Sequence, residues 1–109
     1  MTDTMPNGRV LLGRDGAVAT MTLNDPAVYN AFGVKLRADI SAALDIVEAS
    51  DARCLVVTGA GNAFCSGANL NDRDRPPRDR QAELRGEVKT DLETWYHPTF
   101  MRLRALDMP

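Results

Sequence analysis

Alternating apolar and polar positions near the start of the chain predict a β-hairpin. We expect strands at residues 9–12 and 17–23, joined through Asp15-Gly16, a dipeptide typical of tight hairpin turns. The second strand would place Ala17, Ala19, Met21 and Leu23 on one face and Val18, Thr20 and Thr22 on the other. This alternation is typical of an antiparallel strand with one buried face. Residues 1–8 are mostly polar and include Pro6, and we expect them to form a flexible tail.

The spacing of apolar residues then changes to three and four, which predicts a helix. Pro26 keeps Asp25 out of helical geometry, so this segment is a loop, and Asn30 is the expected N-cap of the helix. The apolar positions of the helix are Leu36, Ile40, Ala43, Leu44 and Val47, and it should end near residues 50–51. The continuous apolar run at 53–58 predicts a strand buried on both faces of a parallel sheet. A strand, a helix and a strand in this order predict a right-handed crossover.

Charged residues and prolines dominate the next segment. Residues 69–81 alternate basic and acidic side chains around Pro76 and Pro77, which predicts a solvated loop. An alternative is that one or two of its arginines contact a ligand phosphate. Beyond it we expect a helix over 82–96, weakened by Gly86, with an apolar stripe of Leu84, Val88, Leu92 and Trp95 or Tyr96. Pro98 should open a further short helix whose Phe100, Leu103 and Leu106 face inward.

The composition is that of one small globular domain. The chain has 109 residues, of which 44% are hydrophobic and 26% charged, and its net charge of −2 gives no reason to propose nucleic acid or an anionic membrane as a partner. The first residues lack the basic and apolar regions of a secretory signal, so we expect a cytoplasmic location. There Cys54 and Cys65 would be reduced thiols, and the single histidine, His97, gives no set of metal ligands.

A cluster of small residues follows the apolar run and is the first candidate for chemistry. It consists of Gly59, Ala60, Gly61, Ala63, Ser66, Gly67 and Ala68. Glycine permits positive φ and a close approach of the main chain, so such a loop can present bare backbone N–H groups to a ligand. A nucleotide phosphate loop is a weaker alternative, because the glycines do not reproduce G-x-G-x-x-G and no G-K-[ST] is present.

Four motifs follow one another in a specific order: Leu23-Asn24-Asp25-Pro26, Asn30-Ala31-Phe32, Val57-Thr58-Gly59 and the run from Ala63 to Leu70. Together they resemble the enoyl-CoA hydratase/isomerase (crotonase) family, whose pattern reads L-N-R-P, N-A-L, V-V-L-T-G and A-F-C-A-G-A-D-L. The resemblance covers residues 10–109 and rests on the co-occurrence of the motifs. It implies an α/β fold, a crotonase-like spiral of β-β-α units that closes into two stacked sheets, assembled as a homo-trimer or hexamer.

The resemblance also implies a function in acyl-CoA and fatty acid metabolism, as an enoyl-CoA hydratase or isomerase. Family members stabilise a thioester enolate with two backbone N–H groups, and the first donor here would be the amide of Ala68. The implied contacts to substrate and CoA are Ala27, Val28, Asn30, Ala31, Gly67, Ala68, Asn69, Leu70 and Asn71. Coenzyme A would enter as part of the substrate, with no separate cofactor. Two departures, Asp25 for arginine and Asn69 for aspartate, leave the details of CoA contact open.

The end of the chain departs further from the pattern. In the family a proline near Pro109 opens a strand, P-V-I-A-A-V-N-G, that leads to the second oxyanion donor and the catalytic carboxylates. We therefore expect residues 9–109 to be the N-terminal part of a crotonase-like domain, inactive without the C-terminal half. The alternative is a non-catalytic acyl-CoA-binding or vestigial half-domain that needs a partner chain. The reaction and the acyl-chain specificity stay open.

His97 lies in Trp95-Tyr96-His97-Pro98, between two expected helices. A histidine at a helix break beside a pocket is a candidate general base. The alternative is a structural role, in which His97 closes one helix and opens the next.

Overall fold

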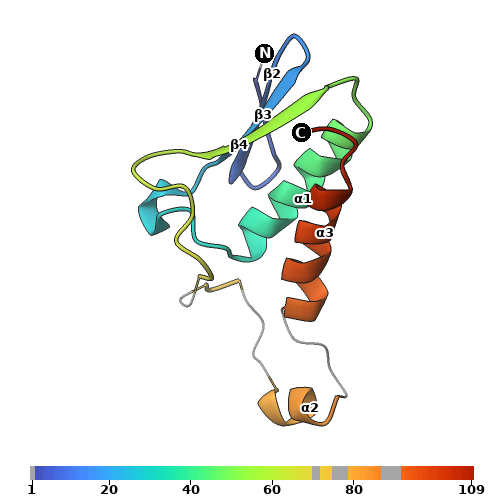
Figure 1. The fold of residues 1–109 in the computed structure, drawn as a ribbon. Helices are drawn as coiled ribbons and strands as arrows, with labels where there is room; N and C mark the ends of the chain where they lie inside the picture. Colours follow the sequence, from blue (N-terminus) through green and yellow to red (C-terminus); the bar gives the residue numbers. More distant parts are fainter. Residues whose placement is uncertain (1, 70–71, 75–78, 87–91) are drawn as a thin grey trace.

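The computed structural model describes residues 2–69, 72–74, 79–86 and 92–109 and consists of a four-stranded sheet with helices packed against it (Figure 1). Strands β1 (Thr2–Thr4), β2 (Val10–Asp15), β3 (Val18–Leu23) and β4 (Cys54–Gly59) lie in that order across the sheet. β2 runs antiparallel to both of its neighbours, β1 and β3, and β4 runs parallel to β3. The predicted hairpin and the predicted parallel strand are both confirmed.

Helix α1 (Val34–Glu48) connects β3 to β4 and covers one face of the sheet. Its five expected apolar positions are all buried, together with Ala19, Met21 and Leu23 of β3 and with Val10 and Leu12 of β2. The core therefore lies between the sheet and α1, as the two periodicities of the sequence predict. A hairpin followed by a helix is one β-β-α unit, which agrees with the expected crotonase-like repeat.

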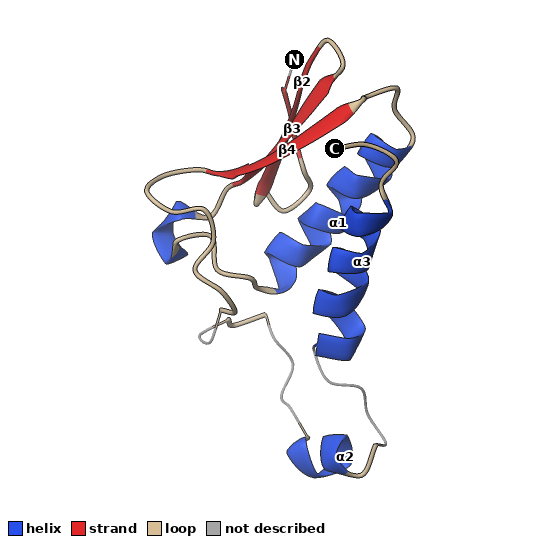
Figure 2. Ribbon diagram, viewed as in Figure 1, coloured by secondary structure: helices blue, strands red, loops and turns tan. Residues whose placement is uncertain are grey.

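Among the described residues, three further helical segments follow β4. The short helix α2 (Arg80–Leu84) lies apart from the sheet, and the π-helical segment η2 (Leu92–Tyr96) leads directly into α3 (His97–Ala105) (Figures 1 and 2). Pro98 occupies the first turn of α3, as expected. Helix α3 lies beside α1 and is fastened to it by Arg102, whose guanidinium donates to Ser41 at 3.0 Å and to Asp45 at 2.8 Å.

The expectation of one continuous helix over 82–96 was wrong. Helix α2 ends at Leu84, and Gly86 has a φ of +73°, a conformation that interrupts a helix. Leu84 is 87% exposed and so does not belong to an apolar stripe, while Val88 lies outside the described residues. Leu103 of α3 and Leu106, the C-cap that follows the helix, pack against the core as expected, but Phe100 is half exposed.

The expectation of a flexible tail over 1–8 was also wrong. Thr2–Thr4 pair with β2, and Met5 is buried in the core. The cause is Asp39, a buried carboxylate in the middle of α1 that accepts the N–H groups of Asn7 at 3.0 Å and Arg9 at 2.8 Å. These bonds hold the turn before β2 against the helix and carry the preceding residues back along the sheet.

Strand β4 is less buried than its apolar sequence predicts. It lies at the edge of the sheet among the described residues, and Val56 is 43% exposed. Only one face of the strand meets the core, so the prediction of a strand buried on both faces was wrong. The last residue of the chain lies beside this edge, because the Leu55 N–H donates to the Pro109 carbonyl at 2.9 Å.

The closed end of the hairpin is tied to the loop before β4. Arg14 donates to the Gly16 carbonyl at 2.7 Å and to the Asp51 carboxylate at 2.9 Å. The hydrogen bond and the positive charge of Arg14 hold the pKa of Asp51 below its ordinary value. This ion pair lies near the amino-terminal ends of β3 and β4. The loops that follow these two parallel strands leave their carboxyl-terminal ends, so the ion pair is remote from those loops.

Candidate functional site

The two loops that follow β3 and β4 lie side by side and carry most of the candidate residues. Because the strands are parallel and in register, with Leu23 opposite Gly59, both loops leave the same edge of the sheet. The Ser66 N–H donates to the Tyr29 carbonyl at 3.0 Å, and the Ser66 hydroxyl donates to the Val28 carbonyl at 3.2 Å. The two segments predicted to contact CoA, 27–31 and 67–71, therefore come together in space as far as they are described.

Asn30 joins the two loops from within. Its side chain is fully buried, its Nδ2 donates to the carbonyls of Ala60 at 3.0 Å and Ala63 at 2.9 Å, and its Oδ1 accepts the Asp25 N–H at 2.7 Å. The prediction that Asn30 caps the helix was wrong. The N-cap of α1 is Gly33, and Asn30 has a φ of +56°, which asparagine tolerates better than most residues.

The close approach of these loops needs a glycine at position 59. A Cβ at Gly59 would lie 2.5 Å from the Ala63 carbonyl oxygen and 2.8 Å from the Asn30 Nδ2. Real Cβ atoms do not approach backbone oxygen this closely, so the loop after β4 could not fold back over a larger residue. The glycine predicted to allow a close backbone approach is therefore required by packing around Asn30.

Ala68 is paired with Phe32 through a short parallel bridge. The Phe32 N–H donates to the Gly67 carbonyl at 2.6 Å, and the Asn69 N–H donates to the Phe32 carbonyl at 2.7 Å. In this pattern Phe32 bonds to both neighbours of Ala68, so the N–H of Ala68 points away from Phe32. No described residue accepts that N–H, and Ala68 is exposed. The Ala68 N–H is therefore a backbone donor that has no partner within the described part of the chain.

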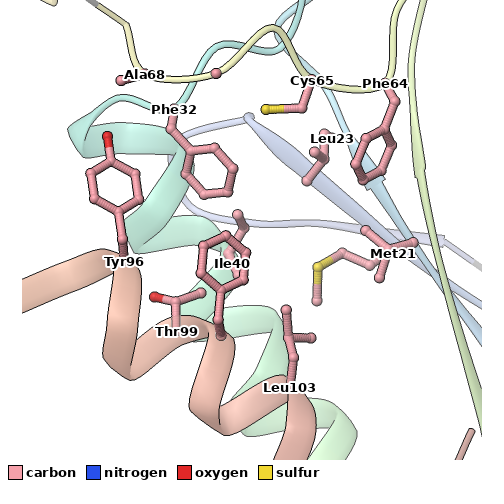
Figure 3. A pocket seen from close by; sticks show the side chains of 13 residues that line it. Met21, Leu23, Phe32, Ile40, Phe64, Cys65, Ala68, Tyr96, Thr99 and Leu103 are labelled. Atoms are coloured by element: carbon pink, nitrogen blue, oxygen red, sulfur yellow. The ribbon is translucent and has the colours of Figure 1, made fainter. Parts of the chain in front are cut away.

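A pocket of about 440 Å³ opens beside Ala68, between the sheet, α1 and α3 (Figure 3). The residues that line it are Met21, Leu23, Phe32, Ile40, Val57, Phe64, Cys65, Gly67, Ala68, Tyr96, Thr99, Phe100 and Leu103. The volume falls within the range of small-molecule sites, which are mostly apolar with a few polar groups. Among these residues polar side chains are limited to Tyr96, Thr99 and Cys65, and the Tyr96 hydroxyl is directed to the end of the pocket where Ala68 lies (Figure 3).

The pocket can bind an apolar group but holds few groups that could move a proton. None of the described residues that line it carries a carboxylate, an amine or an imidazole. His97 is the first residue of α3 and is exposed, and it is not among the lining residues. Within the described part of the chain, no three His, Cys, Asp or Glu side chains gather as a metal site. The geometry therefore offers apolar binding next to one backbone donor.

The other predicted contact residues differ in accessibility. Ala27 and Val28 are exposed on η1 (Pro26–Val28), whereas Ala31 is buried and Asn30 uses its side chain internally. Gly67 is exposed with a φ of +107°, a conformation that favours glycine, and Asn69 is half-buried. Leu70 and Asn71 lie outside the described residues.

Sequence reasoning missed the aromatic part of the site. Phe32 was noted only as part of a motif, and Phe100 and Tyr96 only as members of helical stripes. The ring centroids of Phe32 and Tyr96 lie 5.7 Å apart and those of Phe32 and Phe100 6.2 Å apart, both edge to face. Helical spacing shows which residues share a face, but it does not show that this face meets the loop before α1.

The family assignment rests on the match between the chain and a known sequence profile. The profile of the enoyl-CoA hydratase/isomerase family matches residues 13–101, which is most of the chain. The chain belongs to the enoyl-CoA hydratase/isomerase family. The match includes most of the hairpin, the Asn30 loop, the Ala68 loop and the first half of α3, so all of the residues that line the pocket except Leu103 lie within the family segment.

Individual family members support the same assignment. The chain is 40% identical over 93 residues to the 1,2-epoxyphenylacetyl-CoA isomerase of Escherichia coli K12, covering 84% of this chain and 34% of that protein. It is 37% identical over 79 residues to a probable enoyl-CoA hydratase of Rhodobacter capsulatus, covering 72% of this chain and 30% of the relative. The chain thus spans about a third of the length of these family members.

The fold agrees with solved structures of the family. An enoyl-CoA hydratase of Mycobacterium smegmatis superposes with a TM-score of 0.71 at 26% identity, covering 93% of this chain and 37% of that one. The sheet, α1 and α3 are thus the arrangement of a crotonase-type domain over its N-terminal part. Among the described residues there is also no helix with the length and apolar character that a bilayer crossing requires.

Proposed function

We propose that this chain is the part of a crotonase-type enzyme that binds the acyl-CoA thioester and supplies one backbone donor to its carbonyl oxygen. The observation that carries the proposal is the Ala68 N–H, which has no partner among the described residues and lies at the edge of an apolar pocket. The names of both relatives described above specify CoA thioesters, which supports a thioester as the ligand of this chain.

The chemistry follows from where charge develops in the substrate. Hydration of a conjugated thioester, or removal of its α-proton, places negative charge on the thioester oxygen. A fixed amide N–H in a site that excludes water stabilises this charge, and one such donor lowers the barrier by about 3–4 kcal/mol. In the proposed enzyme the Ala68 amide holds the oxygen, and the acyl group enters the pocket behind it. Groups that transfer protons come from outside the described lining residues.

The first test replaces Ala68 by proline, which removes the N–H and no other polar group. In the protein that carries this chain, we expect Ala68→Pro to lower kcat for hydration of but-2-enoyl-CoA by about a hundredfold or more. Ala68→Ser keeps the N–H and should retain most of the rate. Circular dichroism and the unfolding temperature establish that both variants fold. A folded Ala68→Pro variant with a rate near that of the wild type would refute the role of this amide.

A second candidate function is acyl-CoA binding without turnover, favoured by the lack of carboxylates among the described lining residues. The two functions differ in one measurement. A protein that binds acyl-CoA in calorimetry but neither hydrates nor isomerises any enoyl-CoA is a binding module. A protein that does both is an enzyme of the hydratase or isomerase type.

A further inference from the structure

The side chains of the pocket suggest which kind of acyl group it accepts. Four of the lining residues are aromatic, namely Phe32, Phe64, Tyr96 and Phe100. They come from three separate segments, the loop before α1, the loop after β4, and the helical segment around α3. These four rings form an aromatic wall around one cavity. No single amphipathic helix or strand could place them there, because they come from three segments.

The rings are arranged with edges toward faces. Phe32 is the shared member, with interplanar angles of 67° to Tyr96 and 61° to Phe100. Phe64 lies across the pocket from Tyr96 and Phe32 (Figure 3) and is 57% exposed, so its ring is accessible to a ligand. A planar ring placed between Phe64 and the other three can repeat the same edge-to-face contacts, which a flexible alkyl chain cannot.

Phe32 also couples this wall to the proposed donor. Its backbone bonds to Gly67 and Asn69 on either side of Ala68, while its ring lines the pocket. The Ala68 N–H itself points away from Phe32, but both residues line the same pocket, so a thioester whose oxygen accepts from this N–H would extend its acyl group into the pocket that the Phe32 ring lines. A ring one or two bonds beyond the carbonyl would lie among the aromatic side chains.

We propose, on the basis of the proposed function, that the preferred substrates of this site are thioesters of aryl-substituted acids rather than of straight-chain fatty acids. Each aromatic pair adds to affinity beyond the area buried, by about two- to tenfold. Thr99 gives the pocket a hydroxyl group that can bond to a polar substituent on such a ring. None of the lining residues carries a charged side chain, so the pocket disfavours charged acyl groups.

The test compares two thioesters with the same number of acyl carbons. Phenylacetyl-CoA and octanoyl-CoA bind without reacting, so calorimetry on the protein that carries this chain measures recognition apart from turnover. We expect phenylacetyl-CoA to bind about fivefold or more tightly than octanoyl-CoA, and free CoA to bind more weakly than either. Octanoyl-CoA binding as tightly as phenylacetyl-CoA, or more tightly, overturns the inference and leaves the proposed function intact. Neither thioester binding better than free CoA overturns both.

Variants of Phe100 show whether the rings are the cause. Phe100 lies on α3, away from the loop that carries the donor. We expect Phe100→Leu to reduce the preference for phenylacetyl-CoA by about threefold or more, and Phe100→Tyr, which keeps a ring, to retain it. Leu84→Ala, at an exposed position outside the pocket, is the control and should leave the preference unchanged. A preference that is the same in Phe100→Leu and in the wild type overturns the inference.

Discussion

At the scale of single residues, Asn30 connects the sheet to the proposed donor. Two hydrogen bonds donated by its buried amide hold the loops after β3 and β4 together, and a third, accepted from the Asp25 N–H, fixes the loop after β3 itself. The Phe32–Ala68 bridge follows two residues later. Neighbouring Tyr29 and Asn30 both have positive φ, at +53° and +56°. Such backbone costs about 1–3 kcal/mol per residue, so the bonds of Asn30 offset a local strain.

The replacement of Asn30 by aspartate removes only the two hydrogen bonds that its Nδ2 donates, and so tests their contribution to stability. The shape and the acceptor for Asp25 remain, but a carboxylate oxygen would face the carbonyls of Ala60 and Ala63. We expect Asn30→Asp to lower the free energy of unfolding by about 3 kcal/mol at neutral pH, measured by urea titration. Asn62→Asp makes the same change at an exposed position of the second loop and should have little effect. Equal stabilities of the two variants would contradict the role of Asn30.

The same variant should show a characteristic dependence on pH. Burial raises the pKa of an aspartate at position 30 in the folded state above its value of about 3.9 in the unfolded state. Protonation restores a donor toward the carbonyls, so the stability lost by Asn30→Asp should be recovered as the pH falls toward about 4. A deficit that stays constant or grows relative to the wild type over this range would show that the carboxylate is not the cause.

At the scale of the elements, the position of α3 decides whether the pocket exists. Phe100 and Leu103 form one wall of the pocket, and Arg102, between them, fastens α3 to Ser41, Asp45 and Glu48 of α1. The η2 segment before α3 has a further contact, in which the Arg37 guanidinium lies 4.3 Å from the centre of the Trp95 ring. The polar contacts that α3 and η2 make with α1 thus position the apolar side chains of α3 that line the pocket.

Removal of the Arg102 guanidinium should therefore weaken the attachment of α3 to α1 more than it lowers the stability of the whole fold. We expect Arg102→Met to lower the free energy of unfolding by about 1 kcal/mol, since the ion pairs are partly exposed. Amide hydrogen exchange should rise in α3 while the buried part of α1 stays protected. Arg104→Met, at an exposed position of the same helix, is the matched control. Uniform loss of protection in α1 and α3 would contradict this local role.

The elements that the sequence predicted best are those whose partners lie close in the chain. The hairpin and α1 appear where alternation and helical spacing place them, because Met21 and Leu44 meet the same core whatever follows. The pairing of residues 2–4 with β2 could not be predicted, since it depends on Asp39, a residue of α1 that accepts hydrogen bonds from Asn7 and Arg9. Asparagine is a common helix N-cap, which is why the sequence predicted that role for Asn30. Its side chain bonds elsewhere because the loop after β4 folds against it, and this packing cannot be read from the sequence.

The site divides in the same way. The glycine-rich loop could be predicted because glycines clustered in the sequence indicate a close backbone approach, as at Gly59, or a positive φ, as at Gly67. The aromatic wall was missed because it combines residues of three segments, and no local pattern records that Phe32 and Phe100 meet. The roles predicted for Ala68 and for the CoA-contacting residues stay predictions.

At the scale of the whole molecule, the described residues leave apolar surface open on β4 and around the pocket. β4 pairs with β3 on one side, and Val56, Phe64, Phe100 and Met101 are between 43 and 57% exposed. A strand edge with free backbone groups and apolar neighbours readily pairs with another chain. The Pro109 carbonyl satisfies one of these groups, at Leu55.

We therefore expect the 109-residue chain, when produced alone, to self-associate at micromolar concentration, as measured by light scattering after size exclusion. A lysine on an edge strand disfavours pairing between edges, so Val56→Lys should increase the monomer fraction severalfold. Ala38→Lys adds the same charge at an exposed position of α1 and should not. Similar monomer fractions in the two variants would show that β4 is not the associating surface.

The hydrogen bonds of Asn30 have a consequence for the order of events in folding. They join residues 30 and 33 positions apart in the chain, so they can form only after α1 has brought β4 alongside β3. The hairpin needs no such partner and can form while the remainder is unstructured. We therefore expect the loop that presents Ala68 to be completed late, after the folding transition state. Weakening Asn30 should consequently speed unfolding while leaving the folding rate nearly unchanged.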